Sequence, residues 1–250
     1  MTQAIKEILP IIQHHEIFNK HDFRLVGGTA LSYHIDHRIS EDLDFCLTQE
    51  LPLDDIQAFI EFCVEKFGMD NVDYIEPSQA IKEDFLLGGD NVEYYLQTWM
   101  VNGIKIQFFD GGSNTGTREF LANDMYTTMG NIKIASLETI FKMKSLMFYK
   151  RTKSRDLYDM LCLYALNDDR FTPAMTKSLI MKHEPLYSTE EYFQAMWSES
   201  FKTKKYLTER DEGLAGLVGE LQTFEEMRTK LVKLFQFERI SELRVVGLEG

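Results

Sequence analysis

The stretch that most constrains the fold is residues 23–47, FRLVGGTALSYHIDHRISEDLDFCL. It opens with a short apolar, β-prone segment that ends at Gly27 and Gly28, whose backbones can adopt dihedral angles closed to other residues. The chain can therefore turn sharply there and approach a ligand closely. The next residues have the spacing of a short helix, with Thr29 suited to be its N-cap. This predicts a strand, a tight turn and a short helix before a second strand.

The first turn of this short helix lies next to the Gly-Gly turn. A helix N-terminus presents backbone N–H groups that have no partner within the helix, and its dipole favours negative charge. Such a terminus attracts phosphate. We therefore expect the Gly-Gly turn to bind a phosphate group.

Two aspartates, Asp42 and Asp44, open the second strand. Residues i and i+2 of a strand point to the same face, while Leu43 and Phe45 point to the core. Two carboxylates that close repel each other, and a divalent cation such as magnesium would relieve the repulsion because it prefers oxygen ligands. The alternative is the solvated face of an edge strand, which Asp-x-Asp alone would favour. The Gly-Gly turn upstream favours the metal site.

These residues carry a family resemblance. The string Gly-Gly-Thr-Ala-Leu, followed by His37-Arg38-x-Ser40-x-Asp42-Leu43-Asp44-Phe45, resembles the first motif pair of the nucleotidyltransferase AbiEii toxin family, within the DNA polymerase β-like nucleotidyltransferase superfamily. The resemblance implies that the aspartates hold Mg²⁺ for attack on the α-phosphate of an NTP. It assigns nucleotide binding to Gly27, Gly28, Thr29, Arg38 and Ser40.

The length and net charge of the chain limit the number of domains and the kind of partner that can be expected. With 250 residues, 44% of them hydrophobic, and a mean hydropathy of -0.26, the chain suits one large domain or two smaller ones. Its net charge of -13 argues against a dominant basic surface for long nucleic acids. Any contact with RNA should be confined to local positive patches.

Cysteine usage and the N-terminus are typical of a cytoplasmic protein. Cys46, Cys63 and Cys162 stand apart in apolar surroundings, without the spacing of a zinc site, and are expected to be buried thiols. The sequence shows neither a signal-peptide pattern nor an apolar run of the roughly 18 residues that suggest a membrane span. We therefore expect no membrane association.

The flanking segments predict a mixed sheet. Helices are expected over residues 4–18, kinked or restarted at Pro10, and over residues 53–67, where Asp54 and Asp55 suit the helix dipole. Strands are expected over residues 72–75, 80–87, 93–100 and 104–109, with Asn102-Gly103 as a hairpin turn. A βα unit followed by such a meander gives an α/β (α+β) sheet with helices on one face, as the resemblance to the polymerase β-like core implies.

The position of a third metal ligand stays open. The family commonly places a third carboxylate on a strand such as residues 104–109, where Gln107 occupies the corresponding position. Asp110 could substitute only if the strand ends or bulges there, because three residues along a strand reverse the face. The following GGSNTG segment, residues 111–116, is expected to be a surface loop, since no GKS or GKT sequence follows it.

A second motif pair lies further along the chain. Ser136 suits the start of a helix, and no acid stands between Glu138 and Asp156. Such a basic run is usually a solvated face. It also matches the family's lysine, seven residues before an arginine and twelve before the first aspartate of an Arg-Asp-x-x-Asp-Leu helix. The matching residues are Lys144, Arg151, Lys153, Arg155, Asp156 and Asp159, with Met160 in place of the leucine.

The resemblance gives roles to two of these residues. Lys144 would bring a compact positive charge to the triphosphate and is predicted to be the catalytic lysine. Asp156, near the start of a helix over residues 156–166, could be an N-cap or the salt-bridge partner of Arg155 or Lys153. The resemblance favours an active-site acid or base instead.

The last third of the chain is helical by pattern, over residues 173–183, 189–198 and roughly 213–237. A small basic cluster at Lys202, Lys204 and Lys205 suits either RNA backbone contact or a solvated loop.

These observations predict a two-part enzyme. Residues 1–135 form the nucleotidyltransferase core and residues 136–250 a helical domain that completes the active site. The resemblance implies NMP transfer from an NTP to an acceptor hydroxyl, with Mg²⁺ on Asp42 and Asp44. It also implies a toxin with a cognate antitoxin, acting on tRNA or protein. The alternatives are a small-molecule, antibiotic-type nucleotidyltransferase, which the net acidity favours, and a degenerate nucleotide-binding module, which Gln107 suggests.

Overall fold

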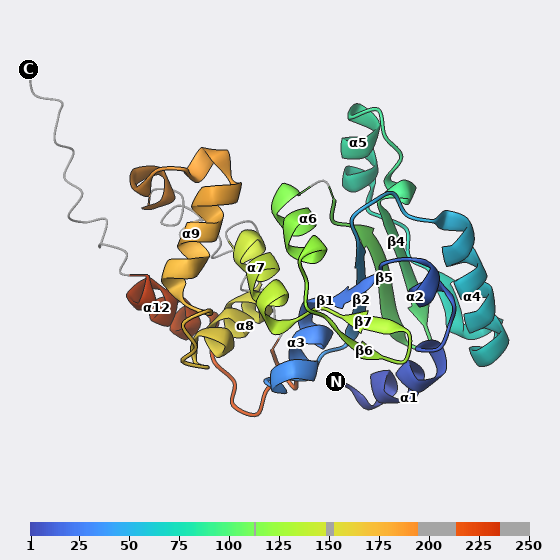
Figure 1. The fold of residues 1–250 in the computed structure, drawn as a ribbon. Coiled ribbons are helices and arrows are strands. Elements are labelled where there is room, and N and C mark those ends of the chain that lie inside the picture. The colour runs from blue at the N-terminus through green and yellow to red at the C-terminus, as the bar shows by residue number, and fades with distance from the viewer. Residues whose placement is uncertain (113, 149–152, 195–213, 236–250) are drawn as a thin grey trace, which may run out of the picture. The chain divides into compact units, whose positions relative to one another are not determined.

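The computed structural model describes residues 1–112, 114–148, 153–194 and 214–235 (Figure 1). The chain divides into two compact units, Met1–Met143 and Lys144–Gly250. The first unit is built on a sheet, and the described part of the second unit is helical.

The sheet has seven strands in the order β3-β4-β5-β2-β1-β7-β6. Strand β2 pairs in parallel with β5, and β1 pairs in parallel with β7, whereas the other neighbours are antiparallel. This mixed sheet with its helices confirms the predicted α/β class. The strands are β1 Arg24–Val26, β2 Asp42–Leu47, β3 Val72–Tyr74, β4 Leu96–Val101, β5 Ile104–Asp110, β6 Thr127–Met129 and β7 Ile132–Ile134.

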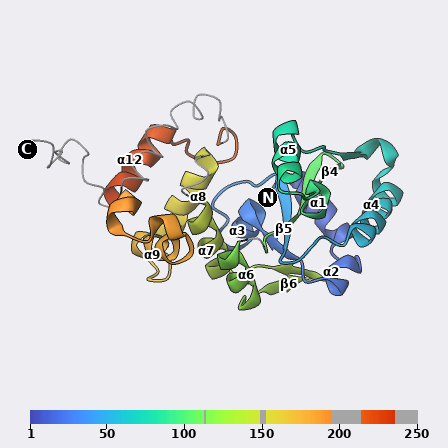
Figure 2. The same cartoon turned by 90° about the horizontal axis from the view of Figure 1, so that it is seen from above.

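Helices α1, α2 and α4 lie on the same side of the first unit in both views (Figure 1 and Figure 2). An aromatic core lies on the buried face of β2 and β5. There the centroid of the Phe108 ring lies 5.2–5.5 Å from the ring centroids of Phe23, Phe45 and Phe59. The helices and 3₁₀ turns of this unit are α1 Gln3–Ile12, α2 Ile17–Lys20, α3 Gly27–Ile35, α4 Leu53–Phe67, η1 Met69–Asn71, α5 Gln79–Leu87, η2 Val92–Tyr94, α6 Thr115–Ala122 and the first part of α7 Leu137–Phe148.

Several predicted elements are confirmed. Helix α4 has the expected bounds. Asp55 lies in its first turn, where its carboxylate pairs with Lys20 and His21. The hairpin turn has positive φ at both Asn102 (49°) and Gly103 (76°). Two positive φ values are what a two-residue type I′ turn requires.

Other predictions were wrong. Residues 80–87 form helix α5 instead of a strand, because Ser78 caps it by accepting a hydrogen bond from the N–H of Ile81. Residues 4–18 form two helices, and the break follows Ile12 while Pro10 lies inside α1. Helix α6 begins within the predicted 111–116 loop, with Asn114 as its N-cap.

The second unit contains the end of α7, α8 Ser154–Tyr164, α9 Pro173–His183, η3 Pro185–Tyr187 and α12 Phe224–Leu234. Helix α8 packs against α12 through buried apolar side chains. Helix α9 has the predicted bounds, whereas α12 begins later than predicted because a capping box between Thr223 and Glu226 starts it. The described part of the predicted helix 189–198 ends at residue 194; Lys150, Arg151, Lys202, Lys204 and Lys205 lie outside the described residues.

Among the described residues, no helix combines the length and apolar character needed to cross a membrane.

Candidate active site

The Gly-Gly turn packs directly against the predicted site residues. Helix α3 starts at Gly27, which has a φ of +71°. A Cβ atom at position 27 would lie 2.4 Å from Asp44 Oδ2, and one on Gly28 would lie 2.6 Å from Arg38 Nη2 and 3.0 Å from Ser40 Oγ. A side chain at either position would push the Asp44 or Arg38 side chain aside, so the turn brings the start of α3 into contact with the aspartate and the arginine.

Thr29 does not cap α3, contrary to prediction. The helix begins two residues before it, and the N-cap is Val26, which makes no side-chain cap. The buried Thr29 hydroxyl instead donates to the backbone carbonyl of Asp42 and lies 2.9 Å from Ser40 Oγ. Thr29 thus ties helix α3 to the strand that carries the aspartates.

Asp42 and Asp44 share one face of β2, as the alternation predicted. Both are half-buried, while Leu43 and Phe45 are fully buried on the other face. Strand β2 lies inside the sheet between β1 and β5. The edge-strand alternative is therefore wrong, and the two carboxylates lie in the middle of the sheet beside the Gly-Gly turn.

Strand β5 contributes two residues beside the aspartates. Asp42 is in register with Lys105, and Asp44 is in register with Gln107. The Lys105 Nζ atom lies 3.0 Å from Asp42 Oδ2. The Gln107 amide donates to Thr98 Oγ1 over 3.1 Å. Sequence reasoning missed Lys105, although it stands two residues before Gln107 and so shares its strand face.

Asp110 does not join the aspartate pair. It lies at the end of β5, in register with Leu47, and its carboxylate accepts a hydrogen bond from the N–H of Gly112. In the part of the chain that the structure describes, no three His, Cys, Asp or Glu side chains gather into a metal-binding group. The protein side chains placed to hold a cation there are Asp42 and Asp44.

In the second unit, Lys144 lies between two carboxylates. Its Nζ atom is 2.6 Å from Asp159 Oδ2 and 3.9 Å from Asp156 Oδ1. The Asp159 side chain is 0% exposed and that of Lys144 is 14% exposed, so this ion pair is shielded from solvent. Asp156 and Asp159 are three residues apart on α8, a spacing that places both on one helix face.

Asp156 does not cap its helix. Helix α8 begins at Ser154 with Lys153 as N-cap, so Asp156 lies in the first turn. The N-cap alternative is therefore wrong. The Oδ2 atom of Asp156 is buried and has no hydrogen-bond partner among the described residues. A buried carboxylate oxygen of this kind suits a ligand.

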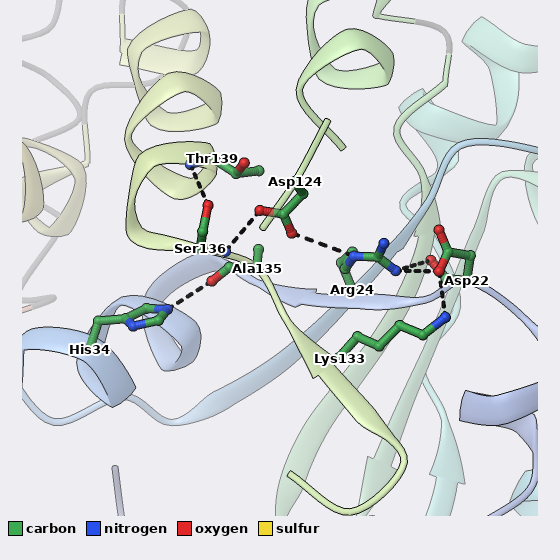
Figure 3. Close-up of polar contacts among 8 residues, drawn as sticks. All are labelled: Asp22, Arg24, His34, Asp124, Lys133, Ala135, Ser136 and Thr139. Carbon is green, nitrogen blue, oxygen red and sulfur yellow. Dashed lines mark hydrogen bonds and ion pairs between the residues drawn. The ribbon is translucent and has the colours of Figure 1, made fainter. Parts of the chain in front are cut away.

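A polar network in the first unit anchors the start of α7 (Figure 3). Asp124 accepts a hydrogen bond from the Ser136 N–H over 3.0 Å, and its other oxygen lies 3.5 Å from Arg24 Nε. Ser136 caps α7 as predicted, since its hydroxyl accepts from the N–H of Thr139. Because the Arg24 and Asp124 side chains are only 5% and 0% exposed, the pair links β1 to α7 within the core.

The same network reaches α3 and β7 (Figure 3). His34 of α3 lies 2.8 Å from the carbonyl oxygen of Ala135, just after β7. Asp22 pairs with both Arg24 and Lys133. Burial alone would raise the pKa of Asp22, but the hydrogen bonds from these two cations lower it below its ordinary value. The strand that precedes the Gly-Gly turn is thus fixed by charge as well as by packing.

The sequence of this chain matches the model of one protein family. The model of the nucleotidyl transferase AbiEii toxin family, a type IV toxin–antitoxin system, matches residues 13–229. The chain belongs to this family. The predicted resemblance and the enzyme class are thereby confirmed, and this AbiEii-family chain is a nucleotidyltransferase of a toxin family. No curated protein matches it.

Solved structures similar to this AbiEii-family chain include two bacterial proteins. JHP933 from Helicobacter pylori has 16% sequence identity and a TM-score of 0.48, over 94% of this chain and 91% of that one. MenT4, a nucleotidyltransferase toxin from Mycobacterium tuberculosis, has 12% identity and a TM-score of 0.45, over 97% of this chain and 85% of that one.

The donor set of the AbiEii-family chain suits a divalent cation of the magnesium type. Asp42 and Asp44 offer hard carboxylate oxygens from one strand face, which is the ligand chemistry that Mg²⁺ prefers. The glycine at position 27 leaves open the space next to Asp44 Oδ2 that a side chain would fill. Two carboxylates leave the remaining coordination positions to water and phosphate oxygens.

Proposed function

We propose that this chain is a magnesium-dependent enzyme that moves a nucleoside monophosphate from an NTP to an acceptor hydroxyl and releases pyrophosphate. The observation that carries the proposal is the contact of Gly27 with Asp44, where a Cβ would lie 2.4 Å from the carboxylate oxygen. A phosphate-binding helix start and a metal-binding carboxylate pair are useful together only if a nucleotide phosphate bridges them.

Residues of the first unit would hold the nucleotide. Backbone N–H groups at Gly27 and Gly28, at the start of α3, would bind the triphosphate, and the Arg38 guanidinium beside Gly28 would pair with its oxygens. Thr29 and Ser40 are positioning residues, because their hydroxyls join α3 to β2. Mg²⁺, held by Asp42 and Asp44, would supply positive charge for the phosphate oxygens and orient them for attack.

In the second unit, the motif that residues 144–159 resemble assigns the catalytic lysine and the acid or base. Lys144 is the proposed catalytic lysine, whose compact positive charge would stabilise the charge that accumulates on a triphosphate in the transition state. The buried Asp159 holds the ammonium group from the other side and is a positioning residue. Asp156, with its buried oxygen near Lys144, is the candidate acid or base for the acceptor hydroxyl.

We further propose that the protein is the toxin of a cytoplasmic toxin–antitoxin pair and that its acceptor is tRNA or protein. Family membership supports the toxin role. The net charge of -13 confines any nucleic acid to local contacts.

A labelling experiment tests this proposal. The protein is incubated with each α-labelled NTP and with total tRNA, a protein extract or aminoglycosides, in Mg²⁺ or in EDTA. We expect Mg²⁺-dependent label in tRNA or protein. Label in the aminoglycoside would instead favour the small-molecule enzyme, and nucleotide binding without transfer to any acceptor would favour the degenerate module.

Carboxylate variants connect the activity to the site. Asp42→Asn combined with Asp44→Asn should abolish both transfer and Mg²⁺-dependent NTP binding in calorimetry, because amides do not neutralise a cation. Asp73→Asn is the matched control, since Asp73 is an exposed residue of β3 on the same sheet. Unchanged Mg²⁺-dependent binding in the double variant would show that the metal assignment is wrong.

A further inference from the structure

Lys105 is a charged neighbour of the aspartate pair that the motif resemblance does not assign. It lies on β5 in register with Asp42, and its Nζ atom is 3.0 Å from Asp42 Oδ2. The two residues are 63 positions apart in the sequence. Their side chains are 36% and 31% exposed, so both can be reached from solvent.

The position of this ammonium conflicts with a bound cation. A magnesium ion would sit about 2.0–2.1 Å from a carboxylate oxygen. An ammonium group hydrogen-bonded to the same carboxylate would be held only a few ångströms from the dication, and the two positive charges would repel each other. The Lys105 side chain has an unbranched four-carbon stem, so the ammonium can swing away without moving the strand.

We propose that Lys105 is a tethered cation that competes with the divalent metal for Asp42 and makes metal loading depend on nucleotide binding. Without nucleotide, the ammonium neutralises Asp42 and keeps metal affinity low. When an NTP binds, its phosphate oxygens offer the displaced ammonium a new negative partner and offer the metal additional ligands. This inference rests on the proposed metal role of Asp42 and Asp44 and adds to it a residue that sets the order of loading.

The orientations of the side chains on β5 support a specific role for Lys105 beside Asp42. The neighbouring β5 residue on the same face, Gln107, turns its amide away to Thr98 on β4. Lys105 instead turns toward the carboxylate. A neutral side chain at this position would leave Asp42 available to a metal ion at all times.

The test is direct titration with Mn²⁺, followed by the paramagnetic resonance signal of the free ion, with and without a non-hydrolysable ATP analogue. We expect Lys105→Met to bind Mn²⁺ about tenfold more tightly than wild type without nucleotide, as removal of one charge near a dication implies. The analogue should then tighten Mn²⁺ binding less in Lys105→Met than in wild type.

Two controls match this variant. Lys105→Arg keeps the charge and should resemble wild type. Lys82→Met removes an ion-paired lysine of α5, whose partner is Glu76, and it should leave Mn²⁺ binding unchanged. Thermal unfolding of each variant checks that the fold is intact.

The outcomes separate this inference from the proposed function. If wild type binds Mn²⁺, the Asp42→Asn, Asp44→Asn variant does not, and Lys105→Met binds as wild type does or more weakly, the competition by Lys105 is refuted while the metal site stands. If wild type binds no Mn²⁺ even with the analogue, both the metal site and the inference are refuted.

Discussion

Gly27 and Asp44 lie so close together that a Cβ atom at position 27 would come within 2.4 Å of the Asp44 Oδ2 atom. Position 27 also has a φ of +71°, which side chains disfavour. Two independent physical constraints therefore favour glycine at this position. The contact joins the start of α3 to the carboxylate pair, and an enlarged side chain here should disturb both.

Gly27→Ala should lose nucleotide-dependent metal binding and most transferase activity, because the new methyl group must displace the Asp44 carboxylate. Gly89→Ala is the matched control, with a φ of +82° and no atom within 4 Å of its Cβ position. Both variants should lose about 1 kcal/mol of stability from the backbone conformation. Activity assays and urea unfolding check this, and equal activity in the two variants would argue against the contact.

Lys144→Ala should reduce the transfer rate about 10²–10³-fold, while the NTP dissociation constant rises less than tenfold, because the charge acts mainly in the transition state. Lys144→Arg should rescue poorly, since a planar guanidinium does not replace a compact ammonium. Single-turnover kinetics and calorimetry separate the two effects.

Two variants control this test. Lys142→Ala removes a lysine of the same helix that pairs with Glu138, and it should stay active. Asp159→Asn removes the buried partner of Lys144 and should lower the rate as a positioning change, with partial activity left. A rate loss in Lys142→Ala as large as in Lys144→Ala would point to a general effect of charge.

The three thiols should differ in reactivity. Burial raises the pKa of both Cys46 and Cys63 to about 12, whereas Cys162 is half-buried. In the native protein at pH 8, a thiol reagent should therefore label Cys162 first, and Cys162→Ser should remove the fast phase. Mass spectrometry identifies the labelled residue; fast labelling of Cys46 or Cys63 would contradict their burial.

The same raised pKa values predict a loss of stability at alkaline pH. A thiol with a folded-state pKa above its unfolded value of about 8.5 stabilises the fold fully below that pH. This contribution is lost as the pH rises from about 8.5 toward 12. The urea midpoint should therefore fall less steeply with pH in Cys63→Ala than in wild type.

Expression of the wild-type protein alone should arrest growth, because the chain belongs to a toxin family and we propose that it is itself the toxin. Asp44→Asn and Lys144→Ala should not arrest growth, whereas the Asp73→Asn control should. Culture density after induction, with immunoblots for equal protein levels, measures the effect. Arrest by all four proteins would place toxicity outside the proposed site, and no arrest by wild type would favour a metabolic or resistance enzyme.

The sequence by itself determined the features that depend on local spacing. The face shared by Asp42 and Asp44 follows from the two-residue period of a strand, and the bounds of α4 follow from its helical apolar pattern. The hairpin at Asn102-Gly103 follows from the dihedral angles that these residue types allow. These properties need no knowledge of the neighbouring elements.

The local sequence pattern gave wrong predictions where the same residues suit two different local structures. Residues 80–87 include apolar side chains that suit a strand, but the Ser78 cap begins a helix whose residues are not buried. Thr29 has the chemistry of an N-cap, but α3 begins two residues earlier, at Gly27. Only the backbone geometry decides such cases, because a cap and a first-turn residue look alike in sequence.

Only the tertiary structure decided which distant residues meet. Lys105 reaches Asp42 because β5 pairs with β2 in one particular parallel register, and a shift by one residue would turn it to the other face. Asp124 reaches Arg24 and Ser136 because the start of β1 and the segments before β6 and α7 converge in the core. Side chains far apart in the chain are brought together by sheet order and register, which local spacing does not specify.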